Sequence, residues 1–188
     1  MRNFERVAEG LDVQPLLDAL AARPELWDEI TIRQHYPGSA HKDTEAIFLR
    51  GPYQFTFRDY MMDTTAYDYP AMDALSAQLV PLVRPVLQQL GVTELGYVML
   101  VRLAPGGVIK PHVDEGAYAD HYSRFHLALT GEPGATLTAG DETQHFAPGE
   151  CWWFNHKVRH SAVNDSDQWR THLIIDAITP RFAVHVPS

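Results

Sequence analysis

The sequence predicts a mainly β protein: a double-stranded β-helix, or jelly roll, with N-terminal helices packed on one of its two sheets. Two observations support this prediction. In the second half of the chain, short apolar segments alternate with turns rich in proline, glycine, asparagine and aspartate, and about eight such segments suffice for two antiparallel sheets. In the first half, apolar residues recur at helical spacing, so we expect helices there.

Two segments of the first half are expected to be helical. The first covers 11–22, and Pro24 ends it because the residue before a proline avoids the helical conformation. The second covers 72–90. Since Pro81 and Pro85 lack the backbone N–H that a helix interior needs, we expect this second helix to be kinked or split in two.

The strands are expected in two groups. In the first half, strands are predicted at 45–50 and 53–58, with Gly51 and Pro52 between them. In the second half the expected strands are 97–103, 108–113, 124–130, 135–139, 142–146, 151–154, 160–164 and 170–178. Only a short polar turn separates the last two, so we expect them to pair as an antiparallel hairpin.

Length and composition favour a single globular domain over 1–188, with a helix-and-strand part at about 1–95 and a jelly-roll core at about 96–180. The formal net charge of −9, without a cluster of lysine and arginine, argues against a nucleic-acid partner. The N-terminus lacks the apolar core of a signal peptide and no apolar run has membrane-spanning length, so we expect a cytoplasmic protein with no membrane contact. The single Cys151 fits a reducing compartment.

The most informative pattern is formed by His112, Asp114 and His160. Residues i and i+2 of a strand point to the same face, so His112 and Asp114 can both face the mouth of the barrel. Closure of the barrel can bring His160, which begins a later strand, opposite them. Two imidazoles and one carboxylate on one face of iron(II) form the triad of non-haem oxygenases. Each residue alone is more often structural, but the combination predicts an iron(II) site.

Basic residues on two other strands indicate a second ligand. Arg124 and His126 share one face of an otherwise apolar strand, and Arg170 begins the last strand. Arginine binds carboxylates with two parallel hydrogen bonds, so Arg170 is expected to bind a dicarboxylate co-substrate deeper in the barrel than the metal. Arg124 and His126 are expected to contact the same co-substrate. The alternative for these two is a buried ion pair with an acidic residue.

These residues resemble the aspartyl/asparaginyl β-hydroxylase family of iron(II)- and 2-oxoglutarate-dependent dioxygenases. The similar segments are 102–114, 124–129, 147–154, 160–161 and 170–176, and more weakly 43–50. The vertebrate enzymes of this family have glycine at the position of Asp114 and serine at the position of Val101. The complete triad of this chain is therefore more similar to bacterial members, some of which resemble hydroxylases of free amino acids.

The resemblance implies a function and a role for each candidate residue. It implies that the triad holds Fe(II), that Arg170 binds the distal carboxylate of 2-oxoglutarate, and that Arg124 and His126 lie near its other end. It also implies that O2 is used to hydroxylate an unactivated C–H bond of an amino acid or a peptidyl residue, a small-molecule or peptide substrate. Three further basic residues are candidate substrate contacts, each equally well explained as a solvated surface charge: Arg50, Arg102 and Lys110.

Two other functions remain open. Cupin metalloenzymes are also jelly rolls, and Pro148-Gly149 followed by 160–164 resembles part of one cupin motif, but a cupin site would leave Arg170 unexplained. The other is a metal- or ligand-binding jelly-roll module without catalytic activity. Conversion of 2-oxoglutarate to succinate distinguishes the dioxygenase from both. The sequence does not predict the oligomeric state.

Overall fold

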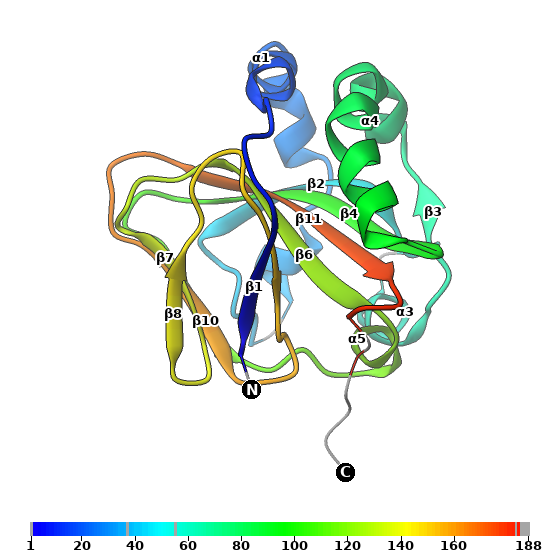
Figure 1. The fold of residues 1–188 in the computed structure, drawn as a ribbon, viewed down its shortest axis with the longest axis vertical. Helices are drawn as coiled ribbons and strands as arrows, with labels where there is room; N and C mark the ends of the chain where they lie inside the picture. Colours follow the sequence, from blue (N-terminus) through cyan, green and yellow to red (C-terminus); the bar gives the residue numbers. More distant parts are fainter. Residues whose placement is uncertain (1, 37, 55, 183, 185–188) are drawn as a thin grey trace.

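The computed structural model describes residues 2–36, 38–54, 56–182 and 184, and two antiparallel β-sheets dominate it (Figure 1). The large sheet has the order β1 (Phe4–Ala8), β9 (Cys151–Phe154), β6 (Ser123–Thr130), β11 (Arg170–Ile178), β4 (Glu94–Leu103), β2 (Thr44–Gly51) and β3 (Tyr67–Asp68). The small sheet has the order β5 (Val108–His112), β10 (His160–Asn164), β7 (Ala135–Ala139) and β8 (Glu142–His145). This is the predicted jelly roll, and the eight core strands differ from the predicted ones by only a few residues at their ends.

The helices are mostly in the first half of the chain, as predicted. They are α1 (Gln14–Ala21), the 3₁₀ helix η1 (Pro24–Asp28), α2 (Ile32–His35), α3 (Phe57–Met62), α4 (Pro70–Leu90) and α5 (Ala117–His121). Helices α1 and α4 cover one face of the large sheet (Figure 1), where Leu16 and Leu75 belong to the same buried apolar cluster as Leu100 and Leu173. The opposite face of that sheet is turned toward the small sheet.

The second helix was expected to be kinked or split in two, and the split is wrong, because α4 is one helix with Pro81 and Pro85 inside it. Both prolines lie on its exposed face, while Leu82 and Val86 are buried against the core. The carbonyls that lose an N–H partner at each proline can therefore bond to water. Burial of the apolar face keeps the helix whole.

Two other expectations about strands are also wrong. No strand forms in the described part of 53–58: helix α3 begins at Phe57, because the Thr56 side chain accepts a hydrogen bond of 3.0 Å from the backbone N–H of Asp59 and caps the helix. Strand β1 was not expected, since its five residues show only a short alternation of apolar and polar side chains. It pairs with β9 at the edge of the large sheet. An isolated short alternation gives a weak strand signal.

The expected hairpin between the last two strands does not exist, because β10 and β11 lie in different sheets. Strand β10 pairs with β5 and β7, whereas β11 pairs with β4 and β6. The Asn164 side chain holds the crossing between them, since its amide donates to the carbonyls of Leu103, Ala104 and Gln168. Arg170 therefore faces His160 across the barrel and does not lie beside it.

None of the described helices has the length and apolar character needed to cross a membrane.

Cys151 on β9 is expected to be chemically inert. Only 1% of its surface is exposed, and burial raises the pKa of its thiol to about 12. The thiolate is the reactive form, so very little reactive species exists at mildly alkaline pH. We expect no reaction of the native protein with a thiol-directed disulfide reagent, followed by reaction of the thiol in urea. Fast modification of the native protein would show that β9 opens readily.

Candidate metal centre and co-substrate cavity

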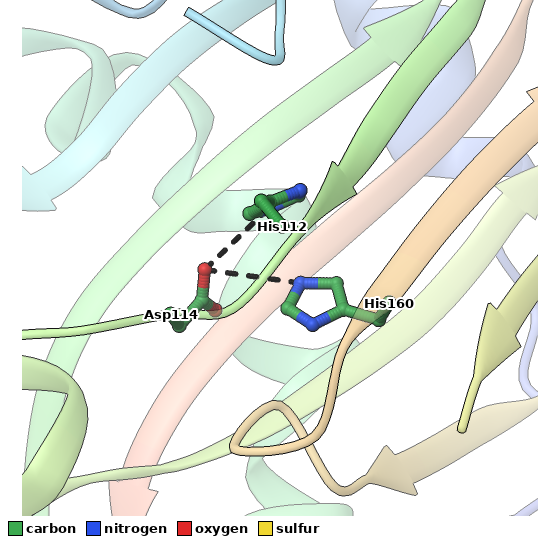
Figure 2. Close-up of side chains that lie close together, drawn as sticks. All are labelled: His112, Asp114 and His160. Atoms are coloured by element: carbon green, nitrogen blue, oxygen red, sulfur yellow. Dashed lines mark ion pairs between the residues drawn. The ribbon is translucent and has the colours of Figure 1, made fainter.

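Three potential metal ligands meet where β5 ends and β10 begins. His112 is the last residue of β5 and lies directly opposite His160, the first residue of β10, while Asp114 follows just beyond β5. Figure 2 shows the three side chains turned toward one another. The Nε2 atoms of His112 and His160 lie 3.5 and 3.8 Å from Asp114 Oδ1, and the three candidate ligand atoms lie within 4.8 Å of one another. One metal ion can contact all three.

Both histidines are held in the form that binds a metal. The Nδ1 atom of His112 hydrogen-bonds to the Lys110 carbonyl at 2.7 Å, and that of His160 to the Val158 carbonyl at 3.0 Å. A carbonyl can only accept, so each Nδ1 carries a proton and, in the neutral ring, Nε2 is the nitrogen with the free lone pair. Burial lowers the pKa of His160 to about 4, which keeps its ring neutral. Orientation by a hydrogen bond from the second ring nitrogen is usual for metal-bound histidine, so these residues fit a metal ion.

Asp114 is fixed by a buried chain of charges. Its Oδ2 accepts a 2.5 Å hydrogen bond from Arg124, whose guanidinium also makes two bonds of 2.8 and 2.9 Å to Asp176. Tyr118 donates to Asp176 as well, at 3.1 Å. Burial is the largest single influence and would raise the pKa of Asp114, but the charge of Arg124, together with the neighbouring histidines, holds that pKa well below its usual value. Asp114 is therefore a carboxylate whose Oδ1 remains turned toward the histidines.

Arg124 thus forms the buried ion pair that was the alternative expectation, with Asp114 and Asp176 as partners. Its guanidinium also borders the cavity described next. A contact between Arg124 and a co-substrate therefore stays a prediction. Asp176 was not singled out in the sequence, although a lone acidic residue in an otherwise apolar strand indicates a buried partner.

An inner cavity extends from the two triad histidines between the sheets to Arg170. Arg170, His172 and Ile174 alternate along β11 and face this cavity. Arg170 is 5% exposed, and no acidic residue of the described chain forms an ion pair with it. Its Nε and Nη2 atoms lie 3.1 and 3.0 Å from the ring nitrogens of His172. Burial lowers the pKa of Arg170 to about 10, because nothing nearby compensates its charge.

The other polar groups at this end of the cavity carry no compensating charge. Burial, and then the charge of Arg170, hold the pKa values of His126 and His172 well below their usual range, so both rings are neutral. Their Nδ1 atoms lie 3.2 Å apart, while the buried Nε2 of His126 has no hydrogen-bond partner in the described structure. One uncompensated guanidinium and one unpartnered imidazole nitrogen are a suitable environment for a carboxylate ligand.

An outer cavity lies on the other side of the triad. It is lined by Asp114, Glu115, Tyr36, Tyr60 and Met61, among others. Four residues border both cavities: Arg33, His41, His112 and Arg124. The potential metal centre therefore lies at the junction of an inner and an outer cavity, as a reaction between two bound molecules requires.

Comparison with known proteins is consistent with this geometry. Residues 38–180 match the model of the family described as aspartyl/asparaginyl beta-hydroxylase, which covers more than half of the chain. The chain belongs to this family. The resemblance of the separate motifs is thereby confirmed over a continuous segment that includes the triad and Arg170.

Curated relatives of this hydroxylase-family chain include two proline hydroxylases. An L-proline cis-4-hydroxylase of Rhizobium meliloti (strain 1021) is 27% identical over 133 residues, which cover 70% of this chain and 46% of that protein. L-proline cis-3-hydroxylase 1 of Streptomyces sp is 29% identical over 110 residues, which cover 57% of this chain and 38% of that protein. The chain spans less than half the length of either relative.

Solved structures confirm the fold of this family member. An oxidoreductase of the 2OG-Fe(II) oxygenase family from Burkholderia pseudomallei has a TM-score of 0.55 at 12% identity, covering 90% of this chain and 92% of that one. A Pseudomonas putida prolyl-4-hydroxylase has a TM-score of 0.53 at 14% identity, covering 95% and 94%. These likenesses establish the jelly-roll architecture.

None of the three candidate substrate contacts lines either cavity of this hydroxylase-family chain, so their contact with a substrate stays a prediction. Arg102 faces away from the inner cavity, because its neighbour Val101 faces it. Lys110 is exposed although it alternates with His112, because the pairing of β5 with β10 shifts register between Ile109 and His112. Arg50 makes an ion pair of 2.7 Å with Asp68. Alternation along β4 thus turns Arg102 away from the inner cavity.

Arg102 instead stabilises the fold. Its guanidinium lies 4.4 Å from the ring centres of both Trp27 and Trp169, and it pairs with Glu45 at 2.5 Å. Replacing Arg102 with glutamine should lower the free energy of unfolding by about 1 to 2 kcal/mol, since these contacts are partly exposed. Urea unfolding measures this. Binding of metal and of 2-oxoglutarate should not change, and altered binding would return Arg102 to the site.

Arg33 and His41 are the site residues that sequence reasoning missed. Both border the two cavities, and Arg33 is 5% exposed. They lie in a segment without strand alternation, at and after the short helix α2. A basic residue in such a segment is normally solvated, so the position of Arg33 and His41 in the sequence did not indicate that they belong to the site.

Proposed function

We propose that this chain is an iron(II)- and 2-oxoglutarate-dependent dioxygenase that hydroxylates an unactivated C–H bond of an amino acid or peptidyl residue. The observation that supports this most directly is the inner cavity, which joins the two histidines of the triad to the buried, uncompensated Arg170. Family membership and the relation to two proline hydroxylases support the same class of reaction.

His112, Asp114 and His160 would hold the iron, because their ligand atoms converge and both imidazoles are oriented by backbone carbonyls. Iron(II), when bound, supplies the redox chemistry that couples decarboxylation of 2-oxoglutarate to succinate with insertion of one oxygen atom of O2 into the C–H bond. Arg124 positions Asp114, so that a single carboxylate oxygen faces the metal. Coordination positions then remain for the two substrates.

Arg170 would bind the distal carboxylate of 2-oxoglutarate. Its contacts with His172 hold the guanidinium in place before the ligand arrives, so little side-chain entropy is lost on binding. The unpartnered Nε2 of His126 is a second group near the same ligand. Because Arg170 is buried, its ion pair with the ligand would be partly shielded from water and thereby strengthened.

The outer cavity would receive the molecule that is hydroxylated. It borders His112 and Asp114 but not Arg170, so the substrate would reach the metal through a different cavity from the co-substrate. The relatives named as proline hydroxylases favour a free amino acid as the substrate over an aspartyl or asparaginyl residue of a peptide.

The test is spectroscopic and then chemical. Anaerobic addition of iron(II) and 2-oxoglutarate should produce the visible charge-transfer band that forms when a 2-oxo acid chelates iron(II). Admission of air, with a panel of amino acids and peptides, should then produce succinate. A cupin-type metalloenzyme or a non-catalytic binding module would form no succinate, and absence of both the band and succinate would refute the proposal.

A further inference from the structure

A second buried guanidinium lies beside the potential metal centre. Arg33 is 5% exposed, and its partners are neutral: Nη1 contacts the Met99 sulfur at 3.4 Å, and Nη2 contacts Nδ1 of His41 at 3.3 Å. Its Nε is buried without a hydrogen-bond partner. Within the described chain no ion pair joins Arg33 to an acidic residue. A buried cation in this state is costly, and native proteins normally compensate it.

The segment that carries Arg33 is firmly held. The buried Ser39 hydroxyl donates to the Arg33 carbonyl and accepts from the backbone N–H of His41 at 3.0 Å. The Ala40 carbonyl accepts from the backbone N–H of Lys110, which ties the segment to β5. The His41 ring packs edge-on against His112, with ring centres 5.0 Å apart. Arg33 is therefore positioned in advance next to the triad.

The formal charges of the loaded site leave Arg33 uncompensated. Bound iron(II) and Arg170 would together balance Asp114 and a doubly charged 2-oxoglutarate, while Arg124 is balanced by Asp176. The remaining acidic residue of the outer cavity, Glu115, is exposed to solvent. One negative charge is missing on the substrate side.

We propose that Arg33 binds the carboxylate of the substrate, and that the outer cavity is therefore specific for a small carboxylate-bearing molecule of the free amino acid type. This inference rests on the proposed function and names the substrate class of that site. The second carboxylate of 2-oxoglutarate is not the partner, since chelation of the metal already neutralises it. Arg33 also lies before residue 38, where the family match begins, so it is a feature of this chain outside the matched segment.

The experiment uses the protein loaded anaerobically with iron(II) and 2-oxoglutarate. The charge-transfer band is recorded while the free L-amino acids are added one at a time, because a molecule bound next to the metal perturbs that band. Each amino acid that perturbs it is then compared with its own amide, which keeps the side chain and removes the carboxylate charge. We expect at least one amino acid to perturb the band and its amide to bind about tenfold more weakly or worse.

Variants identify the residue responsible. Arg33→Gln should weaken the amino acid response by about tenfold or more, and Arg33→Lys should weaken it less, since it keeps the charge without the planar fork. Arg84→Gln, which removes an exposed arginine of α4, is the matched control and should behave as wild type. As a second measurement, 2-oxoglutarate is titrated into each variant. The affinity for 2-oxoglutarate should stay within about twofold of the wild-type value in all three variants.

The outcomes separate the two proposals. If no band forms with iron(II) and 2-oxoglutarate, the proposed dioxygenase is wrong. If the band forms but no amino acid perturbs it, or amides act as well as acids, the assignment to Arg33 is overturned while the dioxygenase stands. A loss of 2-oxoglutarate affinity in Arg33→Gln would assign Arg33 to the co-substrate instead.

Discussion

Replacing His160 with alanine should weaken iron(II) binding by more than about a hundredfold and abolish conversion of 2-oxoglutarate to succinate. The substitution removes one of three ligand atoms that lie within 4.8 Å of one another, and no other histidine or acidic residue is grouped with them in the described chain. His112 and Asp114 then supply only two of the three ligand atoms that would hold the metal. Iron content after anaerobic loading and gel filtration measures the effect.

The matched control for this substitution is His121→Ala. His121 is exposed near the end of α5, it lines neither cavity, and its 3.7 Å pair with Glu94 is solvated. That variant should bind iron as wild type does. Wild-type iron content in His160→Ala, with the protein still folded by circular dichroism, would contradict the assignment of the triad.

Replacing Arg170 with methionine should raise the 2-oxoglutarate concentration for half-saturation by about two orders of magnitude, because two charge-assisted hydrogen bonds to a carboxylate are lost. Iron affinity should change little, since Arg170 contacts His172 and not a triad residue. Titration of the charge-transfer band, with iron content measured in parallel, separates the two effects. An unchanged 2-oxoglutarate requirement would remove Arg170 from the co-substrate site.

The stability of the same variant gives an independent check. Burial lowers the pKa of Arg170, so the charged guanidinium is disfavoured in the folded protein without a ligand. Methionine has a similar length and carries no charge, so the unliganded variant should lose less than about 1 kcal/mol of unfolding free energy. A larger loss in urea unfolding would indicate that Arg170 is a structural residue whose partner is the protein itself.

The sequence alone predicted what depends on local rules. Turn residues and apolar alternation placed the eight core strands, because a strand with one buried face must repeat every second residue. The same rule put His112 close to Asp114, and Arg170 and His172 on one face of β11. The rule by itself would have placed Lys110 on the face of His112, and only the register shift between β5 and β10 leaves Lys110 exposed.

Only the tertiary structure decided which groups meet across the barrel. It placed β10 and β11 in opposite sheets, gave Arg124 its partner Asp176, and brought Arg33 beside the triad from a segment with no strand pattern. The physical reason is that alternation fixes the face on which a side chain lies but not the strand that pairs beside it. Strand pairing and the partner of a buried charge depend on contacts between residues far apart in the chain, which form only when the two sheets close over one another.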